Sequence, residues 1–196
     1  MKKILAALVF LCLLNSNAFA QNKIRPKALG VSFIFNDFLT AQRIRSGSLG
    51  KVLTDDQWAK FKEMSAGMAI NYYKGLKRHI DFAATLSGSF VNYPFRNKPL
   101  SSNDGFLLEA DASLNFKMVD ESYWVTPFLS AGVGASKFKS SYGAFLPLGI
   151  GLKLNIFDEA ALTIGGQYRV PVTYETTNYH FMYSFGISGV IGNDRK

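Results

Sequence analysis

Two stretches of this chain, Ile80 to Val91 and Phe106 to Met118, alternate between apolar and polar positions. In the second stretch Glu109, Asp111 and Lys117 all fall on one face, and the opposite face carries no charge. A period of two is typical of a β-strand with one apolar and one polar face. About nine to eleven residues of tilted strand cross the hydrocarbon of a bilayer, so both stretches are long enough to span a membrane.

The same alternation recurs along the chain and predicts eight strands. They cover residues 28–37, 65–75, 80–92, 106–118, 123–136, 143–156, 160–170 and 178–191. The connections at 39–64 and 94–105 are long, the one at 137–142 is intermediate, and those at 76–79 and 119–122 are short. An even number of strands with short turns on one rim and longer loops on the other is typical of outer-membrane barrels, whose short turns and termini lie in the periplasm. We therefore predict an all-β fold, an eight-stranded antiparallel up-and-down transmembrane β-barrel.

Alternation alone does not decide whether the apolar face contacts lipid or fills the barrel. An inward apolar face would give a soluble ligand-carrying barrel. The interior of an eight-stranded barrel is narrow, however, and rows of Leu, Ile and Phe would overfill it. Aromatic residues such as Phe82, Phe116 and Tyr168 lie toward strand ends, as in the girdles at membrane interfaces, whereas Leu86 and Ile150 lie mid-strand. We therefore predict that the apolar face contacts lipid.

The first long connection contains a helix-capping pattern. Residues 54–57 read Thr-Asp-Asp-Gln and precede Trp58, Phe61 and Met64 at helical spacing. We expect a short helix here that packs on the barrel rim and covers the mouth.

Residues 1–20 are typical of a cleavable secretory signal. Lys2 and Lys3 precede an apolar run over 4–14, and residues 18–20 read Ala-Phe-Ala, a cleavage site of small residues. The run is shorter than the roughly twenty residues of a spanning helix. Cys12, the only cysteine, would leave with this signal, so we expect no disulfide and no cysteine metal ligand in the mature chain.

Removing the signal leaves 176 residues, 21–196, which we predict to form one outer-membrane barrel domain. The loss of two lysines lowers the formal net charge from +8 to +6. In an exported protein, this mildly basic balance favours anionic lipid or lipopolysaccharide phosphate as partners, rather than nucleic acid.

Three segments resemble the barrel domain of the outer membrane protein A family: residues 128–135 (FLSAGVGA), 142–151 (YGAFLPLGIG) and 167–173 (QYRVPVT). The resemblance covers essentially the whole mature chain and implies a membrane barrel. Members of that family often carry a periplasmic peptidoglycan-binding domain after the barrel. This chain ends five residues after Ile191, so we expect a stand-alone barrel without direct cell-wall anchoring.

The polar faces of the predicted strands carry three acidic and three basic residues. They are Asp81, Glu109, Asp111, Lys117, Lys153 and Arg169. A charge inside a barrel must be hydrated or paired, so these residues predict a lumen charge network that plugs the barrel. The alternative is a narrow, porin-like solute channel in which Arg169 or a lysine exchanges carboxylate partners. The plug is favoured because small barrels are filled rather than open.

Basic residues outnumber acids in the outer loops. The candidate anionic-ligand rim consists of Arg43, Arg45, Lys51, Lys137 and Lys139, with Lys60 and Lys62 nearby. These side chains would suit lipopolysaccharide phosphates or an unknown anionic surface ligand. The alternative is an ordinary solvated rim.

The predicted strands do not bring candidate catalytic residues within reach of one another. Acyl hydrolysis needs Ser, His and a carboxylate within hydrogen-bond reach. His180 and Ser184 share one strand face but are separated by roughly 13 Å of strand. His79 lies in a short turn beside Arg78, as an ordinary solvated histidine would.

We therefore predict a non-catalytic barrel of the Gram-negative outer membrane, without cofactor or metal, inserted by the barrel-insertion machinery. Its role would be structural or in surface interaction. A solute channel is the alternative, and a lipid-modifying outer-membrane enzyme is a distant third.

Overall fold

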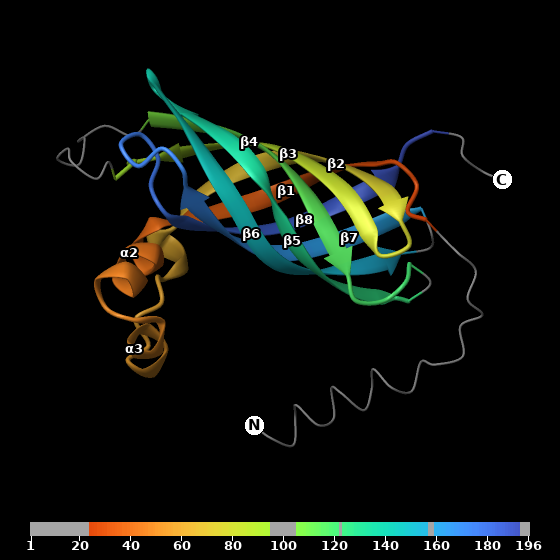
Figure 1. Ribbon diagram of the computed structural model, residues 1–196, viewed down its shortest axis with the longest axis horizontal. Coiled ribbons are helices and arrows are strands. Elements are labelled where there is room, and N and C mark those ends of the chain that lie inside the picture. Colours follow the sequence, from red (N-terminus) through yellow and green to blue (C-terminus); the bar gives the residue numbers. More distant parts are fainter. Residues whose placement is uncertain (1–23, 95–104, 122, 157–158, 193–196) are drawn as a thin grey trace.

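The computed structural model describes residues 24–94, 105–121, 123–156 and 159–192. Within these residues, eight antiparallel strands pair in sequence order, and β8 pairs back with β1 to close a barrel (Figure 1). The strands are β1 (Ala28–Asp37), β2 (Ser65–Lys77), β3 (Ile80–Val91), β4 (Gly105–Lys117), β5 (Val125–Phe138), β6 (Ser141–Ile156), β7 (Ala160–Pro171) and β8 (His180–Val190). The predicted fold class is confirmed.

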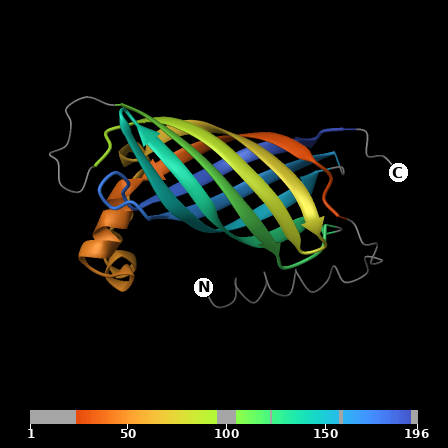
Figure 2. The same cartoon turned by 45° about the horizontal axis from the view of Figure 1, so that its top comes forward.

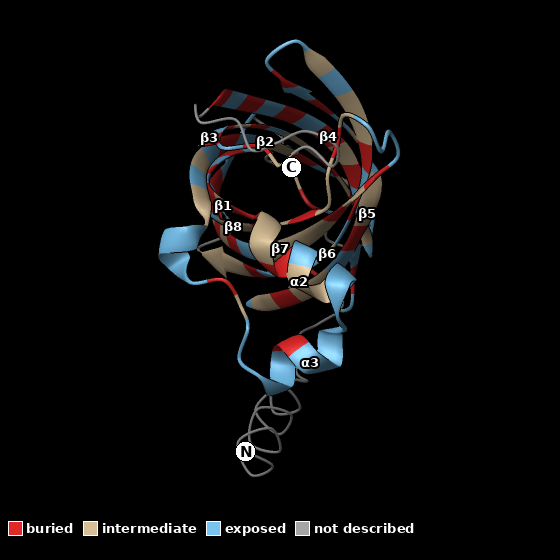
Figure 3. Ribbon diagram, turned by 90° about the vertical axis from the view of Figure 1, so that its left-hand side faces the viewer, coloured by how far each residue is buried: buried red, intermediate tan, exposed pale blue. Residues whose placement is uncertain are grey.

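Each strand presents one face to the lumen and the other to the outside. Every odd position of β4 is buried, and the positions between are exposed or half-buried. The register keeps these faces continuous, because Ala112 of β4 pairs with Ala84 of β3 and with Val133 of β5. The alternation of buried and more exposed positions is visible along the strands in Figure 3.

The outward face is the apolar one. Leu148, Ile150 and Ile187 point away from the lumen and are 50%, 67% and 57% exposed. The prediction that the apolar face points outward is confirmed, and a carrier with an apolar interior is excluded. Closure pairs the strands around the whole barrel, as a sheet in lipid requires because no water can satisfy a free edge there.

Aromatic side chains gather on the outside near both ends of the strands. At the end of the barrel that carries the helices, the rings of Phe90 and Phe106 lie 5.2 Å apart and those of Tyr168 and Phe181 lie 4.8 Å apart. Near the other end, Trp124 is 69% exposed. Such rings favour the headgroup region on either side of the hydrocarbon.

The two ends of the barrel differ in their connections (Figures 1 and 2). One end, the turn end, carries the β2–β3, β4–β5 and β6–β7 connections and both ends of the described chain. The opposite end, the loop end, carries the helices, the β5–β6 hairpin and the β7–β8 connection. The predicted signal at 1–20 and most of the predicted loop at 94–105 lie outside the described residues. Among the described residues, no helix is long and apolar enough to cross a membrane.

The connection expected at 137–142 is a tight turn. β5 continues to Phe138 and β6 begins at Ser141, so that only residues 139 and 140 turn the chain. Lys139 has a φ of 53°, the left-handed conformation that lets such a turn close. The two strands therefore project at the loop end as one long hairpin (Figure 1).

The predicted position of a helix around 58–64 is wrong. The first connection instead contains α2 (Phe38–Ser46), α3 (Leu49–Thr54) and a short 3-10 turn at Phe61–Glu63. Asp37 caps α2 by accepting a hydrogen bond from Thr40 N, and Ser48 caps α3 by accepting one from Lys51 N.

The predicted capping pattern at 54–57 falls at the end of α3 rather than at the start of a helix. Asp55 is the C-cap of α3, and Asp56 has a φ of 50°, which turns the chain away. In the view down the barrel axis, α3 lies outside the ring of strands (Figure 3). Only the start of α2 reaches over the mouth, where Phe38 packs against Tyr93 and His180.

Candidate functional site

Four residues form a buried charged cluster in the lumen near the loop end. This loop-end cluster consists of Glu109 and Asp111 of β4, Arg169 of β7 and His180 of β8. Arg169 is fully buried; its Nη1 donates to Glu109 Oε2, and its Nη2 donates to Asp111 Oδ2 at 3.0 Å. His180 Nε2 lies 3.5 Å from Glu109 Oε2. The two carboxylates of the cluster share the single guanidinium of Arg169.

Aromatic rings enclose this cluster. The guanidinium of Arg169 stacks 4.7 Å from the centre of the Phe145 ring, and the ring of Phe38, the first residue of α2, stacks 4.5 Å from that of His180. The Phe145 ring fits because position 134 is glycine, where a Cβ would collide with it. Above the cluster, buried Val91, Tyr93, Leu107 and Phe138 pack together with Phe38. This apolar layer closes the loop end of the lumen.

A second group of buried charges fills the turn end. This turn-end cluster consists of Arg25, Asp81, Lys117, Glu121 and Lys153. Lys117 Nζ donates to Asp81 Oδ1 at 2.7 Å and to Glu121 Oε1 at 2.8 Å, and Lys153 Nζ donates to Glu121 Oε2. Arg25 Nη1 lies 3.7 Å from Asp81 Oδ2, and its guanidinium stacks 4.1 Å from the centre of the Tyr73 ring. The cluster carries three positive and two negative charges.

The structure thus divides the six lumen residues chosen from sequence between two clusters. Glu109, Asp111 and Arg169 meet at the loop end, and Asp81, Lys117 and Lys153 meet at the turn end. On β4, Ser113 and Asn115 separate Asp111 from Lys117 and line a cavity of about 40 Å³. The cavity is also lined by Asn71, Tyr73, Phe128, Thr163 and Gln167. It has room for only a few water molecules.

Sequence reasoning missed Arg25, Glu121 and the structural role of His180. Arg25 precedes β1, yet its carbonyl accepts a hydrogen bond from Gly75 N, and its side chain enters the lumen, where Nη2 donates to Ser188 Oγ. Glu121 lies in the β4–β5 connection, where strand alternation does not apply. Charge counting gave no signal for either residue, because the six lumen residues chosen from sequence already balance, three acidic against three basic.

Glu121 titrates as part of this cluster. Burial raises the pKa of its carboxyl, but the neighbouring ammonium groups of Lys153 and Lys117 outweigh burial and hold the pKa below its ordinary value of 4.5. Asp120 precedes it in the same connection. Its bidentate hydrogen bonds from the Arg78 guanidinium likewise lower the pKa of the Asp120 carboxyl.

The residues of the predicted anionic-ligand rim do not form one patch. Arg43, Arg45 and Lys51 belong to α2 and α3, whereas Lys137 and Lys139 belong to the β5–β6 hairpin. The helices and the hairpin tip lie at opposite sides of the mouth (Figures 1 and 3). Lys137 and Lys139 lie 5.2 Å and 5.5 Å from the ring centres of Tyr142 and Phe138. Arg43 donates to the Gln57 carbonyl at 2.7 Å.

The residues considered for catalysis lie apart in the structure. His180 is fully buried in the loop-end cluster, and its Nδ1 donates to the Asn178 carbonyl at 3.1 Å. Ser184 donates to the Gly165 carbonyl at 3.5 Å in the middle of the lumen. His79 lies at the turn end, 3.4 Å from Asp120. In the part of the chain that the structure describes, no group of His, Cys, Asp and Glu residues is placed to hold a metal ion.

The barrel matches several small bacterial barrels of known structure. Outer membrane protein OprG from Pseudomonas aeruginosa has a TM-score of 0.57 at 10% identity, over 88% of this chain and 100% of that protein. Neisserial surface protein A has a TM-score of 0.55 at 13% identity, over 84% of this chain and 97% of that protein. The fold is that of a small outer-membrane barrel.

A third match also covers most of both chains. Ail, the attachment invasion locus protein of Yersinia pestis, has a TM-score of 0.53 at 10% identity, over 85% of this chain and 99% of that protein. No protein-family model matches the chain, and no curated protein matches it. The predicted likeness to stand-alone barrels of the outer membrane protein A type is confirmed at the level of the fold. Identities this low show the fold alone.

Proposed function

We propose that this protein is a non-catalytic barrel of the Gram-negative outer membrane with a structural or surface-interaction role. Its turn end and both termini face the periplasm, and its loop end faces outward. The observation that carries this proposal is an apolar outer wall around a lumen filled by two buried charged clusters. Its partners are the surrounding lipid and lipopolysaccharide, the barrel-insertion machinery and an unknown surface ligand.

The filled lumen directs interaction to the loop end. The loop-end cluster lies under an apolar layer of Tyr93 and its neighbours, and the turn-end cluster includes the inserted Arg25 side chain. Among the described residues, α2, α3 and the β5–β6 hairpin project beyond the wall (Figure 1). A barrel of this kind offers surface rather than a route through the membrane.

The proposal is tested by a heat-modifiability gel on protein purified from outer membranes. Unboiled and boiled samples are expected to migrate differently in detergent, because a closed barrel resists unfolding by detergent alone. In intact cells, added protease should cut within 39–64 and 94–105 and leave the turns uncut. Release of a soluble protein from the periplasm, or cutting at the turns, would contradict the membrane location or the orientation.

A narrow channel is the second candidate, and one observation favours it. Arg169 contacts two carboxylates, so its side chain has two anionic partners between which to move, next to the small mid-lumen cavity. A steady conductance in planar bilayers that changes in Arg169→Ala would support the channel. The absence of conductance in both proteins would support the filled barrel.

A further inference from the structure

The first connection forms an arm at the side of the barrel. The arm comprises residues 38–64, with α2, α3 and the 3-10 turn. Its return segment packs on the outward face: Trp58 Nε1 donates to the Tyr183 hydroxyl at 3.1 Å, and the Phe61 ring lies 4.3 Å from the Phe35 ring. Tyr183 and Phe35 alternate with lumen residues and so belong to the outer wall. The arm therefore continues the outer aromatic surface.

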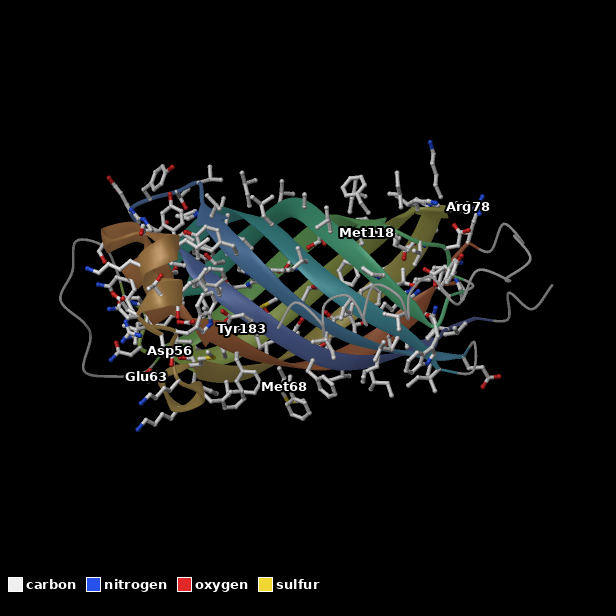
Figure 4. The ribbon with its side chains drawn as sticks, turned by 90° about the horizontal axis from the view of Figure 1, so that it is seen from below. Asp56, Glu63, Met68, Arg78, Met118 and Tyr183 are labelled. Atoms are coloured by element: carbon white, nitrogen blue, oxygen red, sulfur yellow. The ribbon has the colours of Figure 1, made fainter. Side chains whose placement is uncertain are left out.

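Several large apolar side chains of the arm are exposed. Leu49 and Leu53, one turn apart on α3, are 50% and 63% exposed, and Phe61 is 68% exposed. Val52, on the other side of α3, is buried. Figure 4 shows Asp56, Glu63 and Tyr183 together at the loop end, opposite Arg78 at the turn end. Through the contact of Phe61 with Phe35, the exposed apolar face of the arm adjoins the outer aromatic surface.

The arm is also basic. Residues 38–64 contain five basic and three acidic residues. Lys51, Lys60 and Lys62 are exposed, and the guanidinium of Arg45 lies 4.0 Å from the centre of the ring of Tyr179, another residue of the outer aromatic surface. Cations beside exposed leucines and an aromatic ring are the combination that binds an anionic lipid interface.

We propose that the arm is a lipid-binding element that lies on the outer leaflet and binds the phosphates of its phosphorylated glycolipid, lipid A. Leu49, Leu53 and Phe61 enter the boundary between headgroups and acyl chains, and Lys51, Lys60 and Lys62 contact the phosphates. This proposal rests on the proposed function, because it requires the barrel to be in that membrane. It goes further than that function, because it assigns lipid A as the ligand of the arm. Lys137 and Lys139, on the β5–β6 hairpin, are not part of this site.

The test is hydrogen exchange of the full barrel in nanodiscs, with lipid A mixed into phosphatidylcholine or with phosphatidylcholine alone. We expect lipid A to slow exchange of the α3 amides by roughly tenfold or more, since each basic residue at an anionic surface contributes severalfold in binding. Salt of about 1 M should remove the difference, because it shortens the Debye length to about 3 Å.

Three variants make the test specific. Lys51→Gln/Lys60→Gln/Lys62→Gln and Leu49→Ser/Leu53→Ser should each lose most of the slowing by lipid A. The matched control, Lys137→Gln/Lys139→Gln on the opposite hairpin, should retain it. Equal α3 exchange in the two kinds of disc, or an equal loss in the control, would overturn the proposal. Strand amides report separately on insertion: fast exchange there would contradict the outer-membrane barrel itself.

Discussion

Single buried charges in this barrel are held by oppositely charged side chains. Arg169 is the clearest case, because it is fully buried and holds Glu109 and Asp111 at once. Removing one member of a buried ion cluster leaves the others buried without an opposite charge. This lowers the free energy of unfolding by more than the lost attraction alone.

We expect Arg169→Met to lower the free energy of unfolding by about 3–5 kcal/mol, because two carboxylates then lose their cation. Urea unfolding in detergent micelles, followed by tryptophan fluorescence, measures this change. Lys74→Met, at an exposed position of β2, is the control and should change stability little. Adding Glu109→Gln and Asp111→Asn to Arg169→Met should restore part of the loss. Equal effects of the Arg169 and Lys74 substitutions would contradict the role of the cluster.

Glycine at position 134 makes room for the ring beneath Arg169. A Cβ there would collide with Phe145 and lie 3.0 Å from Asp111 Cβ. We expect Gly134→Ala to lower the free energy of unfolding by about 1–3 kcal/mol through overpacking. Gly189→Ala is the matched control, since the nearest atom to a Cβ there is 4.0 Å away. The same unfolding assay compares the two, and a loss no greater than that of the control would contradict this packing.

At the scale of elements, the connections at the turn end are held by charges from several strands. The β4–β5 connection brings Glu121 to Lys117 of β4 and Lys153 of β6. Asp120 in the same connection binds Arg78 between β2 and β3. A short connection therefore joins neighbouring turns to the end of the lumen.

This arrangement predicts acid sensitivity. A carboxyl whose pKa is lower in the folded protein stabilises fully above its unfolded pKa and loses that stabilisation as the pH falls through its folded pKa. The pKa of Glu121 is lowered from 4.5, so unfolding midpoints of the wild type should fall as the pH drops below about 4.5. Glu121→Gln should be less stable at neutral pH and show a shallower dependence in acid. Glu175→Gln, in the exposed β7–β8 connection, should keep the wild-type profile.

At the scale of the whole molecule, the proposed filled barrel has two clusters in series along the lumen. The mid-lumen cavity lies between them and is bounded by residues from all eight strands, including Asn71, Ser113 and Gln167. If the ion pairs of one cluster separate, the other cluster still fills the lumen. Passage of an ion through the barrel therefore requires both clusters to open.

Conductance should therefore respond to paired substitutions. In planar bilayers, we expect Arg169→Ala and Lys117→Ala to remain closed singly and the double variant to conduct. Heat-modifiability gels on each sample identify the folded barrels to be compared. Conduction by Arg169→Ala alone would contradict a series block and would favour the channel over the filled barrel.

Much of the fold follows from local pattern. A period of two over about ten residues defines a strand and its two faces, and β3 matches its predicted range of 80–92 to within one residue. Helix position in the arm could not be obtained in this way. Asp37 and Ser48 cap the two helices that form, and Trp58 and Phe61 contact the outer wall; the pattern at 54–57 carries no information on these contacts.

The sequence by itself determined which strand face is charged, because side-chain direction in a strand depends only on parity. Only the tertiary structure decided how Asp81, Glu109, Asp111, Lys117, Lys153 and Arg169 divide, because strand register and tilt set their height in the lumen. It also decided that Arg25 and Glu121 enter the lumen, since residues outside the strands follow no parity. The arm shows the same division. Its basic charge can be read from the sequence, whereas its position beside the outer wall depends on tertiary packing.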